Sequence, residues 1–301
     1  MRIDQLLPHF DLDNETAYQR WREQKLLDYP TRIEQLIVEI KNPTRLSEAE
    51  REAMLQRIRK TNMVVFAGPG GNDPDKAIPR QLGAQFGLLL LDNNTGADDD
   101  GITSLEVSSD AWHKRYIPYT DRPIHWHTDG YYNELTRQVY GLQLHCVRAA
   151  AQGGENALMD HEIAYIQLRD RDPELVAALM REDAMTIPEN RVDGRVDRPD
   201  RGGPVFMAGP GGALHMRYTA RKRNVVWRED ALTRQAVNAL DEILSADLPY
   251  IYRATLQPGQ GLISNNVLHD RSGFSDDPEA PRLLYRLRYF DRVTAAQSTD
   301  R

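Results

Sequence analysis

The spacing of apolar residues predicts helices early in the chain and strands through much of the rest. Residues 31–41 carry aliphatic side chains at helical spacing, which predicts a helix. Ser47 and Glu50 form a capping-box pattern, which predicts a second helix from there to about residue 60. The short apolar run at 63–66 is followed by glycine and proline, which favours a buried strand that ends in a turn.

The middle of the chain changes character several times. A third helix is expected at about 75–87, and the run 92–101 consists almost wholly of Asp, Asn and Gly, which predicts a polar loop. Most segments in 102–146 are strand-like, and the apolar spacing in 160–180 indicates helix.

The last third combines one long helix with several strands. The helix is expected near 230–245, and strands near 249–256, 261–265 and 282–291. Residues 189–212 repeat Arg, Asp, Pro and Gly, which is typical of a surface loop, with an active-site lid as the alternative. The pattern as a whole predicts a mainly β fold with flanking helices.

Composition and charge narrow the classes of protein. The 301 residues include 38 Lys and Arg against 45 Asp and Glu, so the net charge of −7 disfavours nucleic acid and anionic membranes as partners. Cys146 is the single cysteine, which excludes an internal disulfide. The start of the chain lacks the apolar stretch of a signal peptide, and apolar runs such as 88–91 are too short to cross a membrane. We therefore expect a cytoplasmic protein.

Two His-x-Asp patterns are candidates for metal binding. With 8 histidines and 45 acidic residues, about one such pattern is expected by chance, so the pattern alone is weak evidence. The first, at His9, has no evident third ligand and is interpreted as surface. The second, His127 and Asp129, follows the strand-like segment 122–126, and side chains two positions apart on a strand point the same way. These two ligands would therefore converge.

His269 is the best-placed third donor, because it follows a predicted turn and strand. Two histidines and one carboxylate are the donor set of non-heme Fe(II) oxygenases, which leaves three adjacent coordination positions open. The same set also holds Zn²⁺ with an open position, so a zinc hydrolase is the alternative enzyme, although no general base is evident. A non-enzymatic binding module is a further alternative, but it leaves the arginines after His269 unexplained.

Two basic stretches could bind an anion. The alternation after Arg282 puts Arg282, Arg286 and Arg288 on one face of a strand, where a guanidinium could clamp a dicarboxylate. An exposed basic edge strand is the plainer interpretation. The stretch 215–223 could bring Arg217 or Arg221 to an anionic substrate, but a solvated basic strand and loop is the simpler interpretation.

Taken together, the motifs resemble those of the taurine dioxygenase-like (TauD/TfdA) superfamily of Fe(II)/2-oxoglutarate-dependent dioxygenases. The resemblance covers roughly residues 46–293. It rests on Trp126-His127-Thr128-Asp129, Gly153-Gly154-Glu155-Asn156-Ala157-Leu158, the distal His269, and Arg282-x-x-x-Arg286. No single motif is specific, but their order and spacing together make the assignment much stronger than the His-x-Asp pattern alone.

The resemblance implies a fold, cosubstrates and roles. The fold is a double-stranded β-helix, or jelly roll, with helices packed outside. His127, Asp129 and His269 are implied to bind Fe(II), and Arg282 the distal carboxylate of 2-oxoglutarate. With O₂ as the second cosubstrate, 2-oxoglutarate would be decarboxylated to succinate and CO₂ while a small, anionic organic substrate is hydroxylated.

The chain departs from the family pattern at one position. Where the family usually has a threonine that contacts the same carboxylate, this chain has Asn156, whose amide can also donate a hydrogen bond. By position, Arg286 is implied to bind an anionic group of the substrate. Tyr131 and Asn133 are expected to shape a substrate pocket for something larger or more aromatic than taurine.

The resemblance also bears on domain organisation. We expect one dioxygenase domain over 1–301, with 1–45 as a helical N-terminal extension and 189–212 as a loop or lid insertion. Members of the family often associate, so a homo-oligomer is an open expectation, and no particular surface indicates one.

Overall fold

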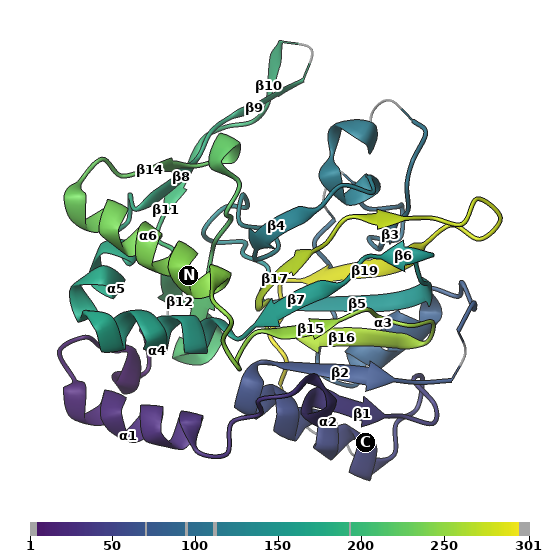
Figure 1. Cartoon of the computed structure of the whole chain (residues 1–301), viewed down its shortest axis with the longest axis horizontal. Coiled ribbons are helices and arrows are strands. Elements are labelled where there is room, and N and C mark those ends of the chain that lie inside the picture. The colour runs from purple at the N-terminus through teal and green to yellow at the C-terminus, as the bar shows by residue number, and fades with distance from the viewer. Residues whose placement is uncertain (1–4, 70, 94–95, 111–112, 193, 295–301) are drawn as a thin grey trace. The chain divides into compact units, whose positions relative to one another are not determined.

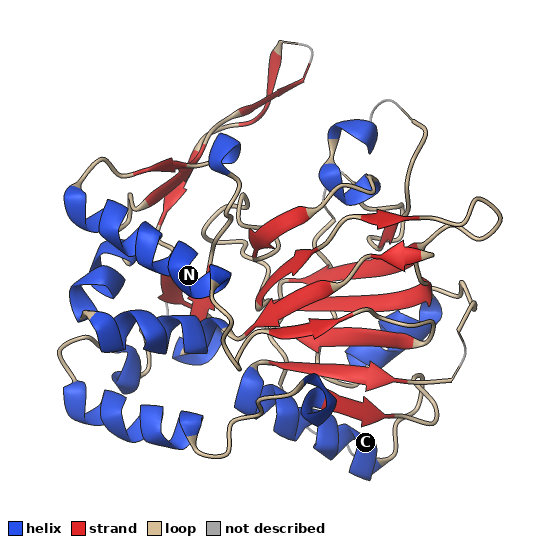
Figure 2. Ribbon diagram, viewed as in Figure 1, coloured by secondary structure: helices blue, strands red, loops and turns tan. Residues whose placement is uncertain are grey.

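A computed structural model describes residues 5–69, 71–93, 96–110, 113–192 and 194–294. The chain forms two compact units, which are described separately (Figures 1 and 2). Unit 1 contains 1–29, 125–138 and 159–251, and unit 2 contains 30–124, 139–158 and 252–301. Among the described residues, no helix has both the length and the apolar character needed to cross a membrane.

Unit 2 is built on a six-stranded sheet in which only β1 and β2 run parallel. Its strands, in spatial order, are β1 (Ile37–Glu39), β2 (Met63–Ala67), β16 (Gln260–Ser264), β5 (Gly141–Arg148), β19 (Leu283–Tyr289) and β3 (Thr103–Leu105). The helices α2 (Glu48–Thr61) and α3 (Ala77–Ala84) contribute buried side chains to one core cluster with β2, β16 and β19. Apolar burial on this face stabilises the sheet.

A second group of strands in unit 2 carries several of the predicted site residues. β15 (Tyr252–Ala254), β7 (Asn156–Met159) and β17 (Leu268–Arg271) lie in that order. A short pair, β6 (Gln152–Gly153) with β18 (Phe274–Ser275), lies antiparallel. Single-turn 3-10 helices occupy Ile33–Leu36, His113–Arg115 and Ile117–Tyr119. The family-like motifs at 153–158 and after His269 therefore lie on or beside neighbouring strands.

Unit 1 combines helices with short strand pairs. The helices are α1 (Glu15–Leu26), α4 (His161–Arg171), α5 (Pro173–Leu179) and α6 (Ala231–Ser245), with 3-10 turns at Pro8–Phe10, Pro210–Gly212 and Lys222–Asn224. The paired strands are β8 (Met185–Ile187) between β11 (Arg201–Gly203) and β14 (Val226–Trp227), β9 (Asn190–Val192) with β10 (Arg195–Arg198), and β12 (Phe206–Ala208) with β13 (Leu214–Met216). The strand β4 (Ile124–His127) begins in unit 2 and ends in unit 1.

Most predicted elements are confirmed, with small shifts at their ends. The capping box is present, with Ser47 Oγ accepting from Glu50 N, and α2 follows it. Asp172 divides the predicted 160–180 helix, because it ends α4 and its side chain caps α5 at Glu174 N. The mainly β fold with flanking helices is thus confirmed.

Two secondary-structure predictions are wrong in part. Residues 31–41 do not form one helix: a single 3-10 turn leads into β1, where Ile37 lies opposite Val65 of β2. The residues buried there are Leu36, Val38 and Ile40, which is the two-residue period of a strand. The segment 189–212 is also not a plain loop, because β9, β10, β11 and β12 lie within it.

Candidate metal and cosubstrate sites

The predicted iron ligands His127 and Asp129 lie together in unit 1. His127 ends β4 and forms a β-bridge with Thr219. The next residue, Thr128, donates its backbone N–H to Tyr218 O at 3.0 Å, and its hydroxyl oxygen accepts from Tyr218 N at 3.1 Å. These contacts with Tyr218 and Thr219 fix the backbone from which the two ligand side chains extend.

The geometry of this pair suits one metal ion. His127 Nδ1 lies 2.9 Å from His125 O, and a carbonyl only accepts, so Nδ1 carries the proton and Nε2 carries the lone pair. His127 Nε2 is 3.8 Å from Asp129 Oδ1. Metal–donor distances of about 2.0–2.2 Å allow two ligands of one ion to lie up to about 4.4 Å apart. The pair is therefore consistent with a shared ion.

His269 lies in β17 of unit 2 and is 6% exposed. Its Nδ1 lies 2.9 Å from the carbonyl of Val267, two residues earlier. His127 has the same arrangement with His125, so both histidines present Nε2 as the atom with the lone pair. A backbone carbonyl that fixes the imidazole in this way is the usual partner of a metal-binding histidine.

Arg282, the predicted cosubstrate ligand, lies just before β19 and is 4% exposed. Its guanidinium carbon is 4.9 Å from the centroid of the Phe274 ring, and that of Arg271 is 4.8 Å from the same centroid. Burial lowers the pKa of Arg282, and burial together with repulsion by Arg282 lowers the pKa of Arg271 to about 9. A guanidinium is not deprotonated in proteins at pH 7, so both groups are cationic. Cys146 does not balance them, because burial raises the pKa of its thiol to about 11.

Asn156 is buried at the start of β7, and its amide is engaged within the protein. Nδ2 donates to Asp270 O at 2.8 Å, while the Asp270 carboxylate accepts from Ala157 N at 2.8 Å. These bonds tie β7 to β17. One of the two amide hydrogens of Asn156, the residue predicted to contact 2-oxoglutarate, therefore already has a structural partner.

The predicted substrate residues lie in two places. Arg286 is in β19, which pairs with β5 on one side and β3 on the other, so the exposed edge-strand interpretation is wrong. Tyr131 and Asn133 follow Asp129 in unit 1, where Asn133 N donates to Gly130 O at 2.8 Å and its Nδ2 to Arg137 O at 3.1 Å. Asn133 thus stabilises the turn that carries Tyr131.

Two arginines in the site regions have roles that the sequence did not show. Arg217 is fully buried and donates to backbone carbonyls, so neither a solvated nor a substrate-facing interpretation describes it. Arg271, two residues after His269, carried no motif of its own. Its position on the same strand face as a predicted ligand was the available signal.

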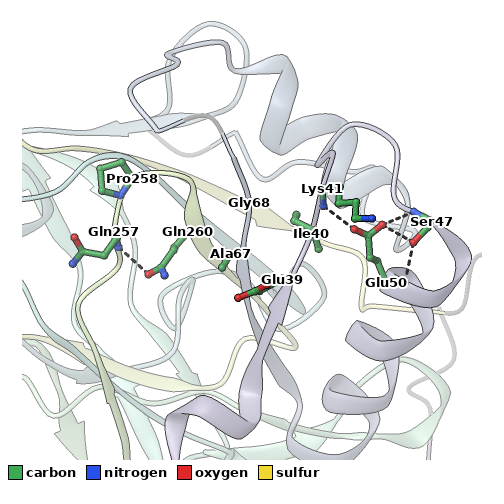
Figure 3. Close-up of a pocket in the computed structure, with 10 residues that line it drawn as sticks. All are labelled: Glu39, Ile40, Lys41, Ser47, Glu50, Ala67, Gly68, Gln257, Pro258 and Gln260. Atoms are coloured by element: carbon green, nitrogen blue, oxygen red, sulfur yellow. Dashed lines mark hydrogen bonds between the residues drawn. The ribbon is translucent and has the colours of Figure 1, made fainter.

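A surface cavity of about 620 Å³ lies elsewhere in unit 2, lined by parts of β1, β2, the start of α2 and the turn before β16 (Figure 3). None of the predicted site residues lines it. Its Glu50 accepts from the backbone N–H groups of Lys41 and Ser47, both at 2.7 Å, and Gln257 N donates to Gln260 Oε1 at 3.0 Å. Since these polar groups satisfy one another, we assign the cavity no role.

The chain matches the model of the taurine catabolism dioxygenase TauD, TfdA family over residues 25–288. It therefore belongs to this family, as the motifs indicated, and the prediction of an oxygenase is confirmed at the level of the family.

Two relatives share a more specific name. A uridine-5'-phosphate dioxygenase from Amycolatopsis sp is 32% identical over 180 residues, which covers 57% of this chain and 62% of that protein. A Streptomyces sp protein of the same name is 30% identical over 194 residues, covering 63% of this chain and 69% of that protein. The match to the Amycolatopsis protein thus spans less than two thirds of its length.

Solved structures agree on the fold. The non-heme iron oxygenase OrfP, in complex with iron and α-ketoglutaric acid, matches with a TM-score of 0.59 at 15% identity and covers 85% of this chain and 86% of its own. An asparagine oxygenase in complex with Fe(II), 3-hydroxyasparagine and succinate matches with a TM-score of 0.57 at 15% identity, covering 81% and 80%. At this identity the likeness is one of fold.

Proposed function

We propose that this protein is an Fe(II)/2-oxoglutarate-dependent oxygenase built on a double-stranded β-helix. His127 and Asp129 of unit 1 and His269 of unit 2 are the proposed iron ligands, and two imidazoles with one carboxylate are a donor set that binds iron(II). The observation that carries the proposal is the common arrangement of His127 and His269. Each is fixed through Nδ1 by a carbonyl two residues earlier, which leaves Nε2 as the donor.

Arg282 is the proposed ligand of the distal carboxylate of 2-oxoglutarate. It is buried and cationic, and its planar guanidinium can bind a carboxylate through two parallel hydrogen bonds. Bound Fe(II), with O₂ and 2-oxoglutarate, would supply the oxidising chemistry that yields succinate and CO₂. The protein holds the imidazole tautomers, and the Asp129 carboxylate offsets part of the charge of the metal.

The proposed substrate is a small anion that bears a phosphate, with uridine 5'-phosphate as the first candidate. Support comes from the two relatives named for that compound. Arg286 is the proposed partner of the anionic group, and Tyr131 and Asn133 are the proposed pocket residues. A phosphate dianion bound to one guanidinium gains from charge-assisted hydrogen bonds.

The reaction class is tested by spectroscopy without oxygen. Fe(II) and then 2-oxoglutarate are added to the metal-free protein, and the weak visible charge-transfer band of the chelate is recorded. We expect the band in the wild type and its loss in His127→Ala and His269→Ala. Metal binding without a band in the wild type would contradict the proposal and favour a zinc hydrolase.

The substrate is tested by succinate formation. Uridine 5'-phosphate is compared with uridine and with taurine under identical Fe(II), O₂ and 2-oxoglutarate concentrations. We expect uridine 5'-phosphate to stimulate succinate formation well above the other two compounds, and Arg286→Ala to raise its KM. Equal stimulation by uridine would contradict recognition of the phosphate.

A further inference from the structure

The region around Phe274 in unit 2 holds more buried positive charge than the protein itself balances. Arg271 and Arg282 are each 4% exposed, and both guanidinium carbons lie within 4.9 Å of the Phe274 centroid. Asp276 is a partly buried carboxylate, and its negative charge raises the pKa of both guanidinium groups. Its Oδ1 accepts from the backbone N of Arg282 at 3.0 Å, its Oδ2 is buried without a partner, and within the described part of the chain it forms no ion pair with either guanidinium. Buried charge of one sign is unfavourable unless an opposite charge pairs with it.

The hydrogen bonds of Arg271 are incomplete. Its Nη2 donates to Thr120 O at 2.7 Å and to Arg122 O at 2.6 Å, which holds the segment that precedes β4. Its Nε and Nη1 are buried and have no acceptor among the described residues. A buried charged donor without an acceptor is strongly unfavourable, so these two N–H groups call for an anion.

The position of Arg271 shows where that anion belongs. Arg271 and His269 are two residues apart in β17, so their side chains extend from the same face of the strand. Arg271 therefore lies on the same strand face as a proposed iron ligand. Its guanidinium and that of Arg282, the proposed cosubstrate ligand, both contact the Phe274 ring.

We propose that Arg271 is a second ligand of the distal carboxylate of 2-oxoglutarate, acting together with Arg282. The inference rests on the proposed function and extends it by one binding residue. It also accounts for Asn156, whose amide donates to Asp270 O. In this chain the second donor to the distal carboxylate of 2-oxoglutarate is Arg271 of β17, in place of the residue at position 156.

The test compares 2-oxoglutarate with 2-oxovalerate, which has a methyl group in place of the distal carboxylate. Dissociation constants of both are measured from the anaerobic chelate band in the wild type, Arg271→Gln and Arg282→Gln. We expect Arg271→Gln to weaken 2-oxoglutarate by about 10- to 100-fold, the range for charge-assisted hydrogen bonds, and 2-oxovalerate by less than about 3-fold. Equal weakening of both compounds, or of neither, would overturn the inference.

Arg148 provides a matched control. Its Nε donates to Pro281 O at 2.8 Å, beside Arg282, so Arg148→Gln removes an arginine anchor while both arginines over the Phe274 ring stay in place. We expect Arg148→Gln to keep the wild-type preference for 2-oxoglutarate. A loss of preference as large as that of Arg271→Gln would show a general disturbance of the fold and overturn the inference.

Two further outcomes separate this inference from the proposed function. If the wild type forms no chelate with 2-oxoglutarate, the proposed function itself has failed. If the wild type binds it and Arg282→Gln alone loses the preference, only the role of Arg271 is wrong. Should Arg271→Gln not fold, Arg271→Lys retains the charge but not the planar fork. It should show a preference between those of the wild type and Arg282→Gln, and an unchanged preference would overturn the inference.

Discussion

Two buried arginines, one in each unit, differ in how many of their hydrogen-bond donors have acceptors within the protein. Arg217 in unit 1 is 0% exposed and Arg271 in unit 2 is 4% exposed. All three nitrogens of Arg217 donate, and the acceptors are the carbonyls of Tyr131, Met185, Arg201 and Pro204. In Arg271, only Nη2 has acceptors among the residues that the structure describes. Burial is therefore similar in the two residues. The number of hydrogen-bond donors that have acceptors distinguishes the structural arginine from the proposed ligand-binding one.

The difference also explains what each arginine holds in place. Arg217 Nε reaches Tyr131 O at 2.7 Å, two residues after Asp129, so it ties the ligand-bearing turn to the β8 and β11 strands. Burial lowers its pKa to about 10, which leaves it protonated at pH 7. Its charge is solvated by peptide carbonyls, which replace the water it has lost.

Replacement of Arg217 should have the largest effect on stability. Arg217→Met leaves four buried or partly buried carbonyls without their donor, and we expect a loss of about 3–5 kcal/mol in the free energy of unfolding. Urea unfolding followed by circular dichroism measures it. A loss below about 1 kcal/mol would show that water can replace the guanidinium at these carbonyls. It would contradict the conclusion that Arg217, unlike Arg271, has a structural role.

A buried histidine in unit 2 differs from the buried arginines, because an imidazole can lose its proton and become neutral on burial whereas a guanidinium stays charged. His145 of β5 is 3% exposed, is stacked against Phe66, and has no hydrogen-bond partner for either ring nitrogen among the described residues. Burial lowers its pKa to about 4. The folded state therefore favours the neutral ring, whereas the unfolded chain takes up a proton at about pH 6.5.

This histidine should make stability depend on pH. As the pH falls from about 6.5 to about 4, the unfolded state binds more protons than the folded state, so stability falls, by up to about 3 kcal/mol. Urea unfolding at pH 7, 6, 5 and 4 measures the slope, and His145→Leu should remove this part of it. An identical slope in both proteins would contradict a buried neutral His145.

The sequence predicted much of this arrangement, but only where a local pattern existed. The capping box, the His127 and Asp129 spacing and the alternation in β19 all depend on neighbours within a few residues. Residues 31–41 were misassigned because a helical spacing of aliphatic residues and a strand period overlap there. Pairing of β1 with β2 decides between them, and that partner lies more than twenty residues away.

The two arginines could not be distinguished from the sequence at all. Arg217 lies in a basic stretch that suggested solvent, yet its acceptors come from residues 13 to 86 positions away. Arg271 follows His269 with no motif, and its significance depends on Phe274, Arg282 and the missing acceptors. Hydrogen-bond satisfaction is a property of the folded chain, so no local pattern records it.

Replacement of Arg271 should affect the stability of the apo-protein less than that of Arg217. Only two carbonyls lose a donor, and removal of a buried charge that the apo-protein leaves unbalanced offsets part of that cost, so we expect Arg271→Gln to lose at most about 1–2 kcal/mol. The larger contrast should come with ligand. With Mn(II) and 2-oxoglutarate at about 100 times the wild-type dissociation constant, the wild type should gain about 2.7 kcal/mol, and a variant binding 100-fold more weakly about 0.4 kcal/mol. Unfolding of both proteins with and without ligand measures this, and equal gains would contradict a binding role.

Replacement of Asn156 should have the smallest effect on stability and on 2-oxoglutarate binding. It tests whether the second donor to the distal carboxylate of 2-oxoglutarate is Arg271 or the residue at position 156. Asn156→Thr restores the hydroxyl of the family pattern but removes the bond from Nδ2 to Asp270 O. That loss should lower stability by about 1 kcal/mol. If Arg271 already binds the distal carboxylate, the dissociation constant for 2-oxoglutarate should change by less than about threefold, because the added hydroxyl finds the carboxylate largely satisfied. Tightening by tenfold or more in the anaerobic titration would instead show that the donor was missing at position 156, and that the N–H groups of Arg271 serve another anion.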